Sequence, residues 1–277
     1  MILSSNIFRF YHSFGIEKTI DIFSKIGVRG IDFNNDIEEF YNDAHNKDYY
    51  VNLNKYAQDK GIKFIQAHAP FGGVFENTDE FVSRITRGMQ KASWIGAPMI
   101  VVHPCKHVNY KEVGFDKMFE YNYNFYKGLV PYAEEYDIKI AIENINLSLT
   151  EKADALVKLY EELNNPVFTV CFDAGHGNVI GENPAEMVKV IGKRIGCTHI
   201  HDNDGSRDQH TLPFYGTTDW EAVMKALAEV DYEGDLNYEA SAFIKDVPQD
   251  LYLEGGYYMS KVGHYLIDRF NYYKSIK

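Results

Sequence analysis

Short apolar runs alternate with helix-like segments eight times along the chain, and no other feature constrains the fold as strongly. The runs at 99–102 and 139–142 are apolar nearly throughout, which is typical of parallel strands whose outer face is covered by helices. No Pro/Gly/Ser-rich linker interrupts the 277 residues. The pattern therefore predicts an α/β protein, a closed (β/α)8 barrel of the TIM type, in a single domain spanning residues 1–277.

The expected elements follow from hydrophobic spacing and from capping residues. Strands are expected at 2–4, 30–33, 62–67, 99–102, 139–142, 168–172, 196–200 and 235–238. Helices are expected at 15–26, 48–60, 79–96, 116–136, 152–163, 184–191, 220–230 and 249–270. An open, doubly wound sheet is the alternative, but no Gly-x-Gly-x-x-Gly follows the first strand, which argues against it.

Residue types that bind metals stand at the ends of six consecutive expected strands. They are His68, His103, Glu143, Asp173, His176, His201, Asp208, His210 and Glu239. A single histidine or carboxylate at such a position is more often a hydrogen-bonded structural group or a helix cap. Barrel closure, however, would bring all nine to the carboxyl-terminal face, where the active sites of such barrels lie. Together they predict a metal site and an enzyme.

Four of the nine are the first-choice metal ligands, because three carboxylates and one imidazole form a hard, oxygen-rich set that suits Mn²⁺, Mg²⁺, Co²⁺ or Zn²⁺. This set is Glu143, Asp173, His201 and Glu239. The other five either bind further ions, up to three in all, or hydrogen-bond a polyol. His199 faces the same side of its strand as His201, one layer deeper in the barrel, and is interpreted as structural.

Composition narrows the partners and the location. The 28 basic residues against 40 acidic ones give a net charge of −12. This balance weakens binding to nucleic acid, which depends on Lys and Arg, and favours a small substrate. The chain shows no run of 18 apolar residues, no secretory signal and no spaced cysteine pair, so a cytoplasmic protein without a membrane span is expected. The 21 Tyr and 18 Phe leave a homo-oligomer possible.

Six short motifs carry a resemblance to a known group of proteins. They are His68-Ala-Pro, His103-Pro, Glu143-Asn, Asp173-Ala-Gly-His176, His201-Asp-Asn-Asp-Gly-Ser-Arg-Asp-Gln-His210 and Gly216-Thr-Thr-Asp-Trp220. In these motifs the chain resembles the xylose-isomerase-like barrel superfamily. That superfamily holds sugar and sugar-phosphate isomerases and epimerases together with endonuclease IV-type apurinic endonucleases. The resemblance covers nearly the whole chain.

The ketose 3-epimerase branch of the superfamily implies one divalent metal ion on the four first-choice ligands. It also implies that Glu143 and Glu239 act as an acid/base pair on opposite faces of the substrate carbon. His176 and Arg207 match positions that contact substrate oxygens in that branch. Lys106 and Arg207 are the basic candidates for contact with a substrate phosphate.

The endonuclease branch implies instead that all nine residues hold a three-zinc cluster. Such an enzyme must grip a bent duplex through basic loops, whereas the loops expected at 9–13 and 34–39 are short and acidic or aromatic. We therefore favour a divalent-metal-dependent isomerase or epimerase of a sugar or sugar phosphate, working through a metal-stabilised enediolate. A zinc-dependent phosphoesterase of the endonuclease IV type is the alternative, and a sugar-binding barrel without turnover is a third hypothesis.

Overall fold

Eight parallel strands form a nearly closed barrel in the computed structural model, which describes all residues except 43, 72–77, 106–109 and 246. The strands are β1 (Leu3–Asn6), β2 (Gly30–Asn34), β3 (Lys63–His68), β4 (Met99–Val102), β5 (Lys139–Glu143), β6 (Phe168–Asp173), β7 (Ile195–His199) and β8 (Leu236–Tyr238). They pair in the order β7-β6-β5-β4-β3-β2-β1-β8. A parallel bridge between Ile200 and Tyr238 joins the two ends of this sheet. The predicted (β/α)8 barrel is confirmed.

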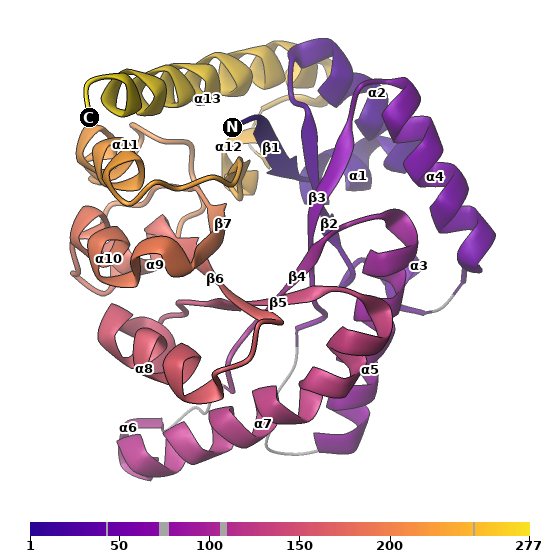
Figure 1. Cartoon of the computed structure of the whole chain (residues 1–277). Helices are drawn as coiled ribbons and strands as arrows, with labels where there is room; N and C mark the ends of the chain where they lie inside the picture. Colours follow the sequence, from indigo (N-terminus) through magenta and orange to yellow (C-terminus); the bar gives the residue numbers. More distant parts are fainter. Residues whose placement is uncertain (43, 72–77, 106–109, 246) are drawn as a thin grey trace.

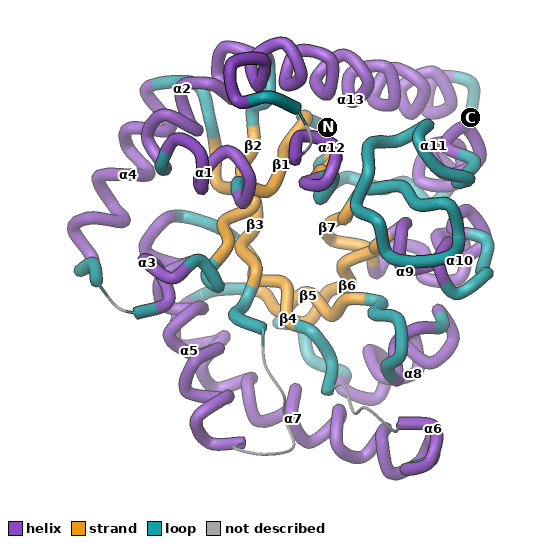
Figure 2. The backbone as a smooth tube through the Cα atoms, turned by 180° about the vertical axis from the view of Figure 1, so that it is seen from behind, coloured by secondary structure: helices purple, strands orange, loops and turns teal. Residues whose placement is uncertain are grey.

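Helices surround the ring of strands (Figures 1 and 2). The long ones are α2 (Ile16–Ile26), α4 (Lys47–Asp59), α5 (Thr78–Ile95), α7 (Phe115–Tyr136), α8 (Ala153–Leu163), α10 (Pro184–Ile191), α11 (Trp220–Glu229) and α13 (Tyr252–Ser275). Each begins and ends within a few residues of its expected position, except that α13 starts and ends later. Helix α13 packs against α11 and α2 (Figure 1), so the last helix of the chain lies beside the first long one.

Five further helices in the described chain lie between a strand and the next long helix and were not expected from the sequence. They are α1 (Phe8–Phe14), α3 (Glu38–Tyr41), α6 (Tyr110–Val113), α9 (Ala174–Val179) and α12 (Ser241–Lys245). None has more than seven residues, which is too short for a 3.6-residue hydrophobic period to show. Each comes after the carboxyl end of a strand, which is the side of the sheet where the candidate ligands lie.

Side chains alternate along each strand between the helix-facing core and the barrel interior. On β5, Ile140 and Ile142 belong to the large core beneath the helices. The interior holds a separate small apolar cluster made of Val101, Ala141, Cys171 and Cys197. The same alternation, continued by two residues, turns Glu143, Asp173 and His199 inward above this cluster. The strand period therefore aims these three side chains at one another.

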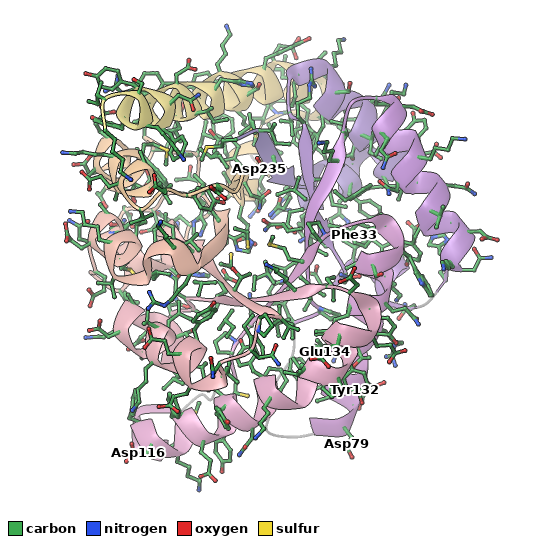
Figure 3. The ribbon with its side chains drawn as sticks, viewed as in Figure 1. Phe33, Asp79, Asp116, Tyr132, Glu134 and Asp235 are labelled. Carbon is green, nitrogen blue, oxygen red and sulfur yellow. The ribbon has the colours of Figure 1, made fainter. Side chains whose placement is uncertain are left out.

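At the opposite end of the barrel, Ile2 is hydrogen-bonded to the start of β8. Asp235, which precedes β8 and is labelled in Figure 3, accepts a hydrogen bond from the backbone N–H of Ile2 at 2.7 Å.

No helix in the described part of the chain is both long and apolar enough to cross a membrane. Cys105, Cys171 and Cys197 are all buried and free of disulfides.

Candidate metal centre

Three carboxylates and one histidine meet inside the barrel mouth. Glu143 from β5, Asp173 from β6 and Glu239 just after β8 have carboxylate oxygens 3.0, 3.8 and 3.3 Å from Nδ1 of His199. One ligand atom from each of the four lies within 4.8 Å of the others, which is the spacing of a shared metal ion. Three of the four expected first-choice ligands, Glu143, Asp173 and His201, are fully buried. His199, interpreted as structural from the sequence, therefore contacts the site directly.

His201, the fourth first-choice ligand, lies between this group and a second one. Its Nε2 is 3.1 Å from Oδ2 of Asp173. Its ring stacks on that of His210 with centroids 4.0 Å apart. One ligand atom each from His201, His176, Asp208 and His210 lies within 4.8 Å of the others. A third group consists of His68, Glu143 and His199, so three groups with metal-binding spacing share this end of the barrel in the described chain.

The remaining two candidates reach the same place from β3 and β4. Oε2 of Glu143 lies 3.0 Å from Nε2 of His103 and 3.7 Å from Nε2 of His68. The two imidazole rings meet edge to face, with centroids 4.7 Å apart. All nine residues expected at the strand ends are thus brought together.

Backbone carbonyls orient three of the imidazoles. The carbonyl oxygens of Ala69, Asn144 and Glu239 accept hydrogen bonds of 2.9 Å from Nδ1 of His68, His176 and His210, respectively. Because each Nδ1 then carries the proton, each Nε2 is left as the ring atom that can bind a metal or a substrate hydroxyl. A histidine that ligates a metal usually donates its other N–H in this way.

Charges in the centre compensate one another. Burial alone would raise the pKa of Glu143, yet His199 and His103 hold it well below its ordinary range. In the same way His176 and His201 lower the pKa of Asp173 against the effect of burial. Burial would lower the pKa of His199, but the carboxylates of Glu239 and Glu143 raise it well above 6.5. Protonated imidazoles thus compensate the negative charge of the buried carboxylates, and a bound cation can compensate the same charge.

Unsatisfied buried atoms test whether these residues fit a metal ion. Three buried side-chain atoms around the centre have no hydrogen-bond partner among the described residues: Nε2 of His68, Nδ1 of His201 and Oδ1 of Asp208. An orphaned buried polar atom is costly, so several in one place indicate a missing partner. Oxygen and imidazole donors in this mixture suit a divalent ion such as Mn²⁺ or Zn²⁺. The residue set fits a divalent metal.

A cavity of about 330 Å³ opens over the centre. Glu143, Glu239, His103, His176, Asp208 and His210 line it together with Phe71, Pro104, Ile145 and Asn146. The volume is that of a small-molecule site. Arg207, expected to contact substrate, is exposed and does not line this cavity. Lys106, the other basic candidate, lies outside the described residues.

Sequence reasoning missed the polar residues that support the ligands. Asn144 donates from Nδ2 to the carbonyl of Asp173 and accepts from its backbone N–H, both at 2.8 Å. Thr150 donates to the carbonyl of Glu143 at 2.7 Å. Beneath His199, the amides of Gln66 and Asn237 donate to the buried Oδ2 of Asp32. For Asp32, Gln66 and Asn237 the available signal was their place inside otherwise apolar strands, because a barrel interior tolerates polar residues only where they find partners.

Comparison with known proteins decides the family. A family model described as "xylose isomerase-like TIM barrel" matches residues 20–252. The chain belongs to this family. The predicted superfamily resemblance is thereby confirmed.

Two curated relatives match parts of the chain. An uncharacterized protein y4fM of Sinorhizobium fredii is 31% identical over 175 residues, which cover 60% of this chain and 53% of that protein. An inosose dehydratase of Clostridium botulinum is 36% identical over 108 residues, covering 33% of this chain and 35% of the enzyme. The chain thus spans about half or less of the length of these relatives.

Solved structures match nearly the whole chain. A D-tagatose 3-epimerase-like protein superposes with a TM-score of 0.78 at 20% identity, covering 98% of both chains. A structure titled as the IOLI protein with a binding zinc atom gives a TM-score of 0.78 at 18% identity, covering 99% of both chains. At these identities the similarity establishes the fold.

Proposed function

We propose that this chain is a divalent-metal-dependent isomerase or epimerase of a sugar or sugar phosphate. One observation carries the proposal: Glu143 on β5 and Glu239 after β8 line the same cavity, above buried ligand atoms that have no hydrogen-bond partner in the described part of the chain. A pair of carboxylates facing one small-molecule cavity suits proton transfer to and from a bound carbon acid. Partial matches to an inosose dehydratase and to a D-psicose 3-epimerase of Enterocloster bolteae support action on a sugar.

The first-choice set of Glu143, Asp173, His201 and Glu239 would hold the ion, with His199 beside it. When bound, the ion supplies Lewis acidity, which makes a proton next to a sugar carbonyl easier to remove. One glutamate removes this proton as the general base. Return of a proton from the other glutamate to the opposite face gives an epimer, and return to the neighbouring carbon gives an aldose–ketose isomer. His103 and His176 line the cavity where they can orient hydroxyl groups.

The Glu239→Gln variant tests the acid/base assignment. We expect the rate of exchange between the substrate C–H and solvent deuterium, followed by NMR over a panel of ketoses, to fall by about 100-fold or more. Glu233→Gln provides the control, because Glu233 is exposed and lies at the opposite end of the barrel. Full activity of Glu239→Gln would sink the mechanism.

A zinc-dependent phosphoesterase is the second candidate, because three of the five outer residues, His176, Asp208 and His210, form a second group with metal-binding spacing together with His201. Metal stoichiometry separates the two functions. About one ion per chain supports the isomerase, whereas three zinc ions together with nicking of an abasic duplex support the phosphoesterase. Action in the cytoplasm and assembly into a homo-oligomer stay predictions from the sequence.

A further inference from the structure

A second cavity of about 320 Å³ adjoins the metal centre. It shares Phe71, His210 and Glu239 with the cavity over the centre. The loops and short helices after β1, β2, β7 and β8 build its walls. Its other lining residues are Asn6, Phe8, Arg9, Asn34, Asp36, Gln209, Ser241, Ala242 and Lys245. A ligand that reaches the metal centre can therefore extend into a second space of nearly equal size.

Two residues of this cavity hold buried polar atoms without a hydrogen-bond partner among the described residues. They are Nε of Arg9, on α1, and Oδ1 of Asp36, in the loop after β2. The guanidinium can only donate hydrogen bonds, and an ionised carboxylate can only accept them. One side chain that donates and one that accepts hydrogen bonds thus line the same cavity.

Hydroxyl groups match this mixture better than an anion does. A hydroxyl both donates and accepts, so a polyol satisfies Arg9 and Asp36 together, whereas a phosphate would meet Asp36 as a like charge. Among the Arg, Lys, Asp and Glu residues of the lining, two are basic, Arg9 and Lys245, and two are acidic, Asp36 and Glu239. Phe8 and Phe71 add the apolar ring faces that complete a small-molecule site.

We propose that the site accepts a sugar carrying a second, uncharged sugar ring, with the reacting ring over Glu143 and Glu239 and the second ring between Arg9 and Asp36. This inference rests on the proposed function for the position of the reacting ring. It names the substrate class as a neutral glycoside rather than a sugar phosphate. Arg9 and Asp36 become residues that select the substrate without touching the reacting carbon.

Calorimetric binding to Mn²⁺-loaded full-length protein tests the inference. The probes are D-fructose, a set of glucosyl-fructose disaccharides, and D-fructose 6-phosphate. We expect at least one disaccharide to bind about tenfold or more tightly than fructose. Arg9→Met and Asp36→Asn are each expected to remove most of that gain and to leave fructose affinity within about twofold.

A cavity-filling variant and a surface control guard against misfolding. Ser241→Phe, on α12, places a ring in the second cavity and should abolish the preference for disaccharides without changing fructose binding. Lys189→Ala serves as the control, because Lys189 lies on the exposed face of α10 in a pair with Glu186. The same circular dichroism spectrum in all variants shows that the fold is kept.

Three results would overturn the inference: equal affinity for fructose and every disaccharide, tightest binding of fructose 6-phosphate, or equal loss of all ligands in Arg9→Met. The proposed function fails separately. Preferential disaccharide binding without any deuterium exchange would refute the isomerase but would still support the second cavity as the binding site of a second sugar ring. Deuterium exchange with fructose but no preference for a disaccharide would support the isomerase and refute the binding of a second sugar ring in the second cavity.

Discussion

At the scale of single residues, His199 links the two proposed acid/base groups to the layer below them. Its Nδ1 lies 3.0 Å from Glu143 and 3.3 Å from Glu239, and its Nε2 lies 3.5 Å from Asp32. The spacing of His199 and His201 on one strand showed which side His199 faces. It could not show that four carboxylates from other strands, those of Asp32, Glu143, Asp173 and Glu239, reach the ring, because that depends on barrel register.

Replacing this ring with an apolar side chain should destabilise the metal-free protein. His199→Leu removes the imidazolium that compensates buried carboxylates, so we expect the free energy of unfolding in urea to fall by about 3–5 kcal/mol. The loss should be smaller with bound metal, because the ion supplies positive charge to the same oxygens. His264→Leu, on the outer helix α13, is the comparison. A loss below about 1 kcal/mol would show that the imidazolium does not balance these charges.

At the scale of elements, the loop after β7 is held by one buried carboxylate. Asp202 accepts hydrogen bonds from Nε1 of Trp220 at 2.8 Å and from the backbone N–H of Phe214 at 3.0 Å. The loop also packs tightly, because a Cβ on Gly216 would lie 2.2 Å from the carbonyl oxygen of Asn203. The segment that carries Asp208 and His210 is thereby fixed against the barrel.

Removal of this anchor should weaken metal binding at a distance. Asp202→Ala leaves several buried N–H groups unpaired, and we expect about 3 kcal/mol less stability and a metal affinity lower by about 10- to 100-fold. Asp204→Ala is the matched control, since Asp204 is an exposed residue of the same loop that bonds only to neighbours such as Ser206. Urea titration and metal titration measure the two effects. Equal behaviour of the two variants would refute the role of Asp202.

The elements of the fold differ in how well they can be predicted from the sequence. The apolar run of β4 and the amphipathic spacing of α2 predict their positions, because burial of one face dictates the period. The strand-end ligands could be predicted for the same reason. The loop anchor could not, because Asp202, Asn203 and Asp204 look alike as turn formers, and tertiary contacts alone make Asp202 a buried acceptor. The second cavity likewise depends on how four loops meet.

At the scale of the whole molecule, the barrel gathers ionisable groups from six strands at one end. In the metal-free protein, imidazolium ions and carboxylates balance each other there. Burial would lower the pKa of His68 and His210, but Glu143 and Asp208, respectively, raise each to about 9. In the metal-free protein, His68 and His210 therefore keep their protons at neutral pH, at the place where a metal ion would bind.

These protonated histidines predict that the thermal stability of the metal-free protein and that of the metal-loaded protein depend on pH in opposite ways. A histidine whose folded pKa lies near 9, above its unfolded value of about 6.5, stabilises the fold fully below pH 6.5 and loses that contribution as the pH rises towards 9. We expect the melting temperature of the chelator-treated protein to fall by on the order of 5–10 °C between pH 6.5 and pH 9.5.

The metal-loaded protein should not show this fall, because metal ligands must be deprotonated and metal affinity therefore rises over the same interval. Differential scanning fluorimetry of both forms in matched buffers measures the contrast, and calorimetry at pH 7 should record proton release when metal binds. If the melting temperatures of the two forms depended on pH in the same way, protons and the metal ion would not compete for the same imidazole nitrogens and carboxylate oxygens. Divergent curves would tie the charge balance of the whole barrel mouth to one ion.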